Sequence, residues 1–213
     1  MKKIMFNDQF GLTQAVLDGR KTMTRRVFYI PEKLASKYYI ESDKLVVCES
    51  QCNGELIQWR DSNDNVRMIF YPIYRIGEII AIAQSYKALG YAPDSLDRDP
   101  KDLGIRGFMR DSAGWNNKMF VLANACKNKI KITNIKVQRL KDISVEDCLS
   151  EGIIKGECGS AETHFMDAYY IPNDKQPYCT PQEAFKILID KIVGKGTWKR
   201  NPYVWAYEFE LVK

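Results

Sequence analysis

The stretch Tyr203-Val204-Trp205-Ala206-Tyr207-Glu208-Phe209-Glu210-Leu211-Val212 carries the most regular β-pattern in the chain and decides its fold class. Large apolar side chains occupy every second position, and they alternate with a second series that includes Glu208 and Glu210. Successive side chains of a strand point to opposite faces of a sheet, so this period of two is typical of a strand. We therefore expect a strand within a sheet, with Trp205 and Tyr207 buried.

Two more segments predict strands of a buried sheet. Gly77 to Tyr86 contains a run of isoleucines that is typical of a strand buried on both faces, so we expect it mid-sheet. Lys129 to Leu140 also alternates, but its apolar set changes parity around Thr133-Asn134. A β-bulge at that point would keep both halves of the strand facing the core.

Insertions separate these strands. Three β-like runs between Leu45 and Tyr71, two of them separated by the turn pair Asn53-Gly54, predict a β-meander inserted at about residues 30–72. Loop insertions are expected at about residues 87–118, where Gly, Pro, Asp and Arg are frequent, and at about residues 154–178.

Helix signals are few and short. Ser144 is a predicted N-cap for a helix through Glu151, which Gly152 ends. Thr180-Pro181-Gln182-Glu183 is a fuller start signal, and the helix after it has one apolar face and stops at Gly194. Strands dominate and no strand-helix-strand rhythm appears, so we expect a mainly β fold with short helices (α+β): a closed or half-closed β-barrel with inserted loops and a C-terminal helix and strand. No linker or repeat divides the chain, which predicts one domain over residues 1–213.

Composition excludes several classes of protein. The 213 residues include 32 basic and 27 acidic side chains, a mild excess that favours a polyanionic partner. Apolar runs are too short for a bilayer span of about 20 residues, and Asn7-Asp8 interrupts the N-terminus before a signal region forms. We therefore expect a cytoplasmic protein without membrane contact. Six cysteines without a C-x-x-C pair and a single histidine favour reduced thiols, exclude zinc deaminase chemistry, and predict no metal and no cofactor.

The segment Gly19-Arg20-Lys21-Thr22-Met23-Thr24-Arg25-Arg26 concentrates four cations and two hydroxyl groups in eight residues. These donors suit a phosphate group or the polar edge of a base. The segment is not a P-loop, because Lys21 follows Arg rather than Gly and a helix rather than a strand is expected before it. A solvated basic turn is the competing interpretation.

This basic segment resembles the G-x-K-T-x-T-x-R element of the ASCH domain family. Tyr74–Ile80, Ile143–Ile153 and Asn201–Phe209 are similar to further elements of that family in the same order, the last to the closing strand of its longer, phage-associated members. The resemblance implies a PUA-like β-barrel. The chain departs from the family pattern at Gln84, where an acidic residue is usual.

The same resemblance implies two functions. ASCH domains are thought to bind RNA or a modified nucleoside or nucleotide in a cleft beside the barrel. The alternative is a metal-independent hydrolase, either a ribonuclease or an N4-acylcytidine amidohydrolase, because some small members cleave that amide with a Lys, a Thr and a Glu. Carried onto this sequence, these catalytic residues are Lys21, Thr24 and Glu151. A lysine with a depressed pKa can act as the base that a threonine nucleophile needs.

Two competing interpretations remain open. Lys21 and Glu151 can form a purely structural ion pair. A phage-type interaction protein, whose long insertions bind a host protein, is the third hypothesis.

The predicted nucleic-acid-binding surface combines the basic segment with three residues outside it. Lys118 adds a cation, and two tryptophans flanked by polar and basic residues are candidates to stack on a base. The complete predicted set is Arg20, Lys21, Thr22, Thr24, Arg25, Arg26, Lys118, Trp115 and Trp198.

Overall fold

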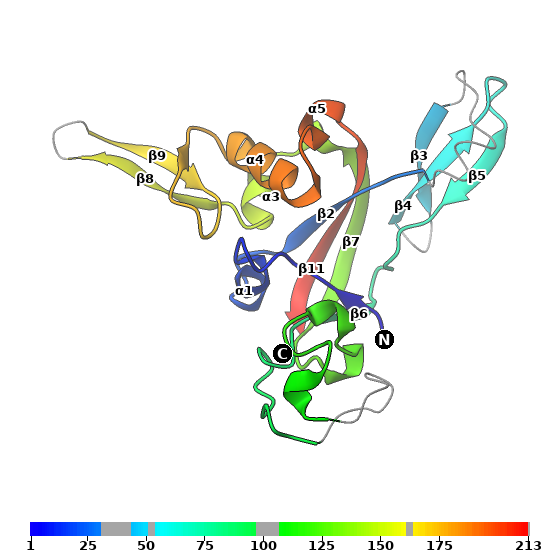
Figure 1. Cartoon of the computed structure of the whole chain (residues 1–213). Helices are drawn as coiled ribbons and strands as arrows, with labels where there is room; N and C mark the ends of the chain where they lie inside the picture. Colours follow the sequence, from blue (N-terminus) through cyan, green and yellow to red (C-terminus); the bar gives the residue numbers. More distant parts are fainter. Residues whose placement is uncertain (31–43, 51–53, 97–106, 161–163, 213) are drawn as a thin grey trace.

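The computed structural model describes residues 1–30, 44–50, 54–96, 107–160 and 164–212. A five-stranded sheet with the order β1-β6-β7-β11-β2 forms its centre (Figure 1). β1 runs parallel to β6, and the other neighbours are antiparallel. The prediction of a mainly β, α+β fold is confirmed. The strands of this sheet are β1 (Lys3–Ile4), β2 (Met23–Val27), β6 (Ile79–Ile82), β7 (Lys129–Arg139) and β11 (Tyr203–Val212).

The long strand predicted near the C-terminus is β11, and it lies between β7 and β2. Trp205 and Tyr207 are buried, as predicted. The hydroxyl oxygen of Tyr207 accepts a hydrogen bond from the backbone N–H of Ile73 at 3.1 Å, so the buried phenol has a polar partner. β6 lies between β1 and β7, which confirms its predicted position inside the sheet.

β7 contains the predicted bulge. Glu208 pairs with Asn134, but the next residue, Phe209, pairs with Ile132, so Thr133 is the extra residue of β7. The bulge moves the apolar series from even to odd positions without turning it away from the core. The buried series comprises Ile130 and Ile132 before the bulge, and Ile135 and Val137 after it.

β1 and β2 are the two edges of the five-stranded sheet, and no backbone pairing among the described strands closes it into a barrel. The edges nevertheless approach each other. The guanidinium of Arg26 on β2 donates a hydrogen bond to the carbonyl oxygen of Met5, just after β1, at 2.6 Å. The sheet is therefore curled, with its two edges facing across a gap.

The meander predicted at about residues 30–72 is present as a separate three-stranded antiparallel sheet. Its strands are β3 (Lys44–Ser50), β4 (Gly54–Arg60) and β5 (Val66–Phe70). β4 lies against β7, where the carboxylate of Glu55 accepts a hydrogen bond from the backbone N–H of Val137. Residues 31–43 and Asn53 of the predicted turn pair lie outside the described residues.

A loop insertion was expected at about residues 154–178, but the described residues of this region include a third sheet of β8 (Ile154–Ser160), β9 (His164–Tyr170) and β10 (Pro177–Tyr178). The β8–β9 hairpin projects away from the central sheet (Figure 1). Most of its side chains are exposed or half-buried. The hairpin therefore lacks the alternation of apolar and polar residues that is typical of a half-buried strand. Exposed ion pairs link its strands instead, such as Lys155 Nζ with the carboxylate of Asp167 at 2.8 Å.

The predicted helix starts are confirmed. Ser144 Oγ accepts a hydrogen bond from the backbone N–H of Asp147 at 3.1 Å, and Thr180 Oγ1 accepts one from Glu183 at 3.2 Å. No helix within the described ranges has the length and apolar character needed to cross a membrane. The α-helices are α1 (Leu12–Leu17), α3 (Val145–Ser150), α4 (Pro181–Val193) and α5 (Thr197–Arg200), and the 3-10 turns are η2 (Met109–Asp111), η3 (Lys118–Phe120), η4 (Ala123–Ala125) and η5 (Leu140–Asp142).

Candidate active site

Backbone hydrogen bonds fix the short connection between α1 and β2 against the end of α3. The N–H of Lys21 donates to the carbonyl oxygen of Ala15 in α1 at 2.9 Å, and the N–H of Thr22 donates to that of Ser150 in α3 at 2.9 Å. Ser150 directly precedes Glu151. Lys21 and Glu151 therefore lie side by side although 130 positions separate them in the sequence.

The Glu-Gly pair at the end of α3 sets the position of the carboxylate. Glu151 is the C-cap of α3, and the N–H of Gly152 donates to the carbonyl oxygen of Leu149 at 2.8 Å. Gly152 has a φ of +101°, a conformation in which glycine avoids the strain that other residues incur. The chain therefore leaves the helix sharply at this point, with Glu151 against Lys21.

Four charged side chains form a compact network at this junction. Lys21 Nζ donates to Oε2 of Glu151 at 2.6 Å and to the carbonyl oxygen of the same residue at 2.7 Å. The guanidinium of Arg25 contacts Oε1 of Glu151 at 3.2 Å and the carboxylate of Asp147 at 2.5 Å. Lys21, Arg25 and Glu151 are each at most 5% exposed. Two cations thus face two carboxylates in a buried setting.

Burial lowers the pKa of Lys21 below the ordinary lysine value of 10.5. Loss of hydration is the largest cause, the carboxylate of Glu151 opposes it, and the nearby cations Arg26 and Arg25 add to the lowering. The amine therefore loses its proton at a lower pH than a lysine in water. A neutral amine in a pocket is able to act as a general base.

A pocket of about 580 Å³ opens beside the network. Lys21, Thr24 and Glu151, which the sequence predicted as one catalytic set, all line it. The β1 end of the sheet contributes Lys3, Met5 and Phe6, and β2 contributes Thr24, Arg25, Arg26 and Val27, so the pocket lies between the two edges of the curled sheet. α4 supplies an apolar wall of Phe185, Leu188, Ile189, Ile192 and Val193.

Arg25 has one donor that its partners leave unused. Its side chain is 0% exposed, and within the described residues its buried Nε–H has no hydrogen-bond partner. A buried donor without a partner is costly, and such groups often mark a position where a ligand or water binds. Because Arg25 lines the pocket, this N–H is a candidate donor to a bound molecule.

The other predicted binding residues do not line the pocket beside Lys21. Thr22 is exposed just before β2. Lys118 Nζ contacts the carboxylate of Asp8 at 2.7 Å. Trp115 packs on a separate apolar cluster around Tyr86, and Trp198 packs on the ring of Phe185 with 6.3 Å between centroids. The set predicted from sequence as one surface is therefore divided among several places.

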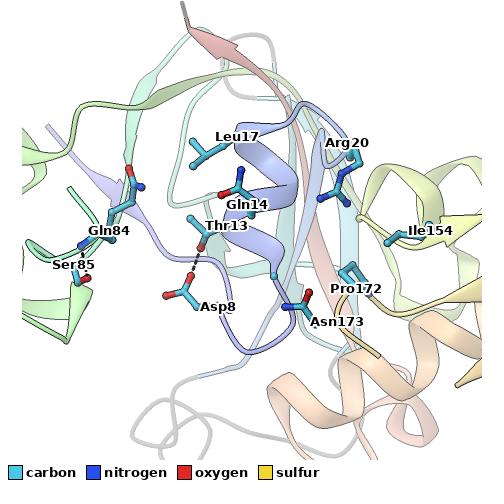
Figure 2. Close-up of a pocket in the computed structure, with 12 residues that line it drawn as sticks. Asp8, Thr13, Gln14, Leu17, Arg20, Gln84, Ser85, Ile154, Pro172 and Asn173 are labelled. Carbon is cyan, nitrogen blue, oxygen red and sulfur yellow. Dashed lines mark hydrogen bonds between the residues drawn. The ribbon is translucent and has the colours of Figure 1, made fainter. Parts of the chain in front are cut away.

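Arg20 lines a second pocket of about 540 Å³, which is also lined by residues of α1. Figure 2 shows Gln84 and Ser85 on one side of this pocket and Arg20, Ile154 and Pro172 on the other, with α1 between them. The charged groups of the pocket are already paired, Arg20 with Asp18 at 2.9 Å and Asp8 with Lys118. Gln84 accepts a hydrogen bond from Asn128 at 2.8 Å.

Asp147 is the member of the network that the sequence analysis did not predict. It lies in the first turn of α3, where an acidic residue also favours the helix start. Asp147 and Glu151 are four residues apart, a spacing that places both carboxylates on one face of a helix. That spacing of two carboxylates, which face the cations Lys21 and Arg25 in the fold, is the signal that identifies Asp147.

In the part of the chain that the structure describes, no group of three or more His, Cys, Asp or Glu side chains is arranged to hold a metal ion. Comparison of the chain with protein-family models, curated proteins and solved structures finds no match.

Proposed function

We propose that the pocket beside Lys21 binds a modified nucleoside or nucleotide and hydrolyses an amide bond on it, as the ASCH resemblance implies for N4-acylated cytidine. One observation carries this proposal: a buried Lys21–Glu151 pair lines the same pocket as Thr24. A PUA-like barrel is part of the proposal, and the curled sheet with a pocket between its edges supports it.

The pocket favours catalysis over a purely structural ion pair. A structural pair needs no adjoining cavity, whereas this pair borders a space of about 580 Å³, within the range of about 300–1,000 Å³ that small-molecule sites occupy. Thr24 is only 5% exposed and still lines that space. A hydroxyl in that position is available to a bound molecule.

In the first step, Thr24 Oγ1 attacks the amide carbonyl carbon while neutral Lys21 takes the hydroxyl proton. The C–N bond then breaks, and the ammonium of Lys21 returns the proton to the leaving amine. The acyl group is left as an ester on Thr24. Glu151 holds the amine of Lys21 through both of its hydrogen bonds during these transfers.

The unused Nε–H of Arg25 is suited to the negative charge that develops on the carbonyl oxygen. Donors fixed in advance around that oxygen are commonly the largest single contribution to acyl-transfer catalysis. The network already holds the guanidinium through Glu151 and Asp147, so the donor needs no rearrangement.

Water completes the reaction. Lys21 removes a proton from a water molecule that attacks the ester carbon, and the Thr24 oxygen leaves and regains its proton. The sum is one amide and one water converted to a carboxylic acid and a free amine, with Thr24 and Lys21 restored. No step requires an external oxidant or reductant.

A small ligand fits the charges better than a long RNA. Arg25 is bound by two carboxylates, and Lys21 by one, so neither offers an unopposed positive charge. Among the described residues that line the pocket, Lys3 and Arg26 are the cations whose side chains donate hydrogen bonds to backbone carbonyl oxygens rather than to carboxylates. Two such cations suit a single phosphate or ribose group rather than a strand of several phosphates.

The experiment is hydrolysis of N4-acetylcytidine by the full chain, with cytidine release followed over a pH series. We expect turnover that rises with pH through the lowered pKa of Lys21 and that falls about 10²- to 10⁴-fold in Lys21→Ala, as removal of a general base does. Lys155→Ala, an exposed lysine on the β8–β9 hairpin, is the control and should keep the wild-type rate. Binding of cytidine without any release of acid would show a binding site rather than an enzyme.

A further inference from the structure

The apolar wall of the pocket extends well beyond the charged network. The five α4 residues in the wall follow the spacing of one helix face and line the pocket, and all of them except Ile192 also pack in the core. Phe185, Leu188 and Ile189 are at most 5% exposed, whereas Ile192 is 37% exposed. The apolar surface thus runs from the core to the mouth of the pocket. Phe6, Leu12, Val27, Ile73 and Tyr74 continue it on the facing side.

The reacting end of the pocket is small by comparison. Lys21, Thr24, Arg25 and Glu151 are the polar groups there, and the positive charges of Lys21 and Arg25 are compensated by Glu151 and Asp147. A neutral amide suits this end, because it needs hydrogen bonds without a net charge. An acetyl amide would use only this end and would not reach along the α4 wall.

We propose that the acyl group of the substrate is large and apolar, an alkyl chain of several carbons or an aromatic ring, and that it lies along α4. This inference rests on the proposed amide hydrolysis at Thr24. Cleavage then releases a hydrophobic carboxylic acid and a nucleoside amine, water supplying the hydroxyl to the acid and the hydrogen to the amine.

The size of the effect follows from burial of the chain. Each methylene moved from water into an apolar environment favours binding by about fourfold. A hexanoyl group has four methylenes more than an acetyl group. If all of them lie against α4, the preference in kcat/KM reaches about two orders of magnitude.

The test compares kcat/KM for the N4-acetyl, N4-butyryl, N4-hexanoyl and N4-benzoyl derivatives of cytidine. Ile192→Ser removes apolar surface at a partly exposed position, so the fold is retained while the hexanoyl-to-acetyl ratio falls. Ile79→Ser is the matched control, since Ile79 is 46% exposed on β6 and lies outside the pocket. This control should keep the wild-type ratio.

Two results separate this inference from the proposed function. Efficient hydrolysis of the acetyl compound with no gain for longer chains would overturn the inference and leave the hydrolase intact. If no derivative is hydrolysed, the hydrolase proposal fails. The apolar site is then tested by calorimetry, which compares the affinity of the protein for N4-hexylcytidine with its affinity for N4-methylcytidine. Tighter hexyl binding that Ile192→Ser weakens would support the apolar site, and equal affinities would overturn it.

Discussion

Replacing Glu151 by Gln removes the carboxylate that neutralises two buried cations while keeping the size of the side chain. Oε2 of Glu151 lies 2.6 Å from Lys21 Nζ, and Oε1 lies 3.2 Å from the guanidinium of Arg25. The side chains of Lys21 and Arg25 are 2% and 0% exposed, so water cannot replace the lost partner. Removing one partner from such a buried pair costs about 3–5 kcal/mol.

Two features of the network decide where in that range the loss falls. Asp147 still holds Arg25, which reduces the cost. Lys21 is able to lose its proton, because burial lowers its pKa, so the penalty shrinks as the pH rises. We expect a larger loss at pH 6 than at pH 9. For a chain of this size the loss corresponds to a fall in Tm of about 6–20 °C.

Thermal and urea unfolding of Glu151→Gln and Glu146→Gln measure this loss. Glu146 is exposed on the same helix, so its variant should change the free energy of unfolding by less than about 0.5 kcal/mol. A Glu151→Gln variant as stable as Glu146→Gln would show instead that the carboxylate of Glu151 contributes nothing to stability.

Three further predictions concern protonation, thiol reactivity and nucleic acid. Because the pKa of Lys21 is lowered, the unfolded chain binds more protons than the folded chain at alkaline pH, and the contribution of Lys21 to the free energy of unfolding rises with pH toward 10.5. The difference in the free energy of unfolding between wild type and Lys21→Met should therefore shift in favour of wild type as the pH rises. A difference that stays constant with pH would contradict this prediction. Burial raises the pKa of Cys148 to about 12, so iodoacetamide at pH 8 should modify the exposed Cys179 and spare Cys148 in the folded protein, as peptide mass mapping would show. Short single-stranded RNA should bind with a shallow salt dependence: the logarithm of the binding constant should fall with the logarithm of the salt concentration with a slope of about −1.4, as for two phosphate contacts. Arg26→Ala should reduce this slope by about half in a fluorescence titration. A steep slope that Arg26→Ala leaves unchanged would show that RNA binds elsewhere on the protein.

The central sheet could be predicted from the sequence because burial leaves a pattern. The period of two in β11 and the parity change in β7 record which side chains face the core, and the bulge at Thr133 follows from that change alone. The helix starts at Ser144 and Thr180 were predictable for a related reason, since caps depend on local hydrogen bonds. These features need no knowledge of distant contacts.

The β8–β9 hairpin left no such pattern. Its strands are stabilised by pairing with each other and expose most of their side chains, so apolar residues are not sorted to one face. A pattern-based reading therefore finds only an irregular polar segment.

The candidate site was predictable only in part. Composition marked the Gly19–Arg26 segment, and the family resemblance selected Lys21, Thr24 and Glu151, which the fold brings to one pocket. The sequence could not show that the side chains of neighbouring residues point to different places. Arg20 lines the second pocket, beside α1, and Thr22 is exposed to solvent. The direction of these side chains depends on backbone hydrogen bonds from this segment to α1 and to α3. α3 is distant in the sequence, so no local pattern records that contact.

The proposed role of Thr24 as the nucleophile is tested most directly by the rate of cytidine release from an N4-acylcytidine by Thr24→Val, measured beside Thr22→Val. Both variants lose one threonine hydroxyl within the same segment, but only Thr24 lines the pocket. We predict that Thr24→Val loses turnover while retaining nucleoside binding, because valine cannot form the acyl ester, and that Thr22→Val keeps the wild-type rate. Equal rates of hydrolysis in the two variants would contradict the assignment of Thr24 as the nucleophile.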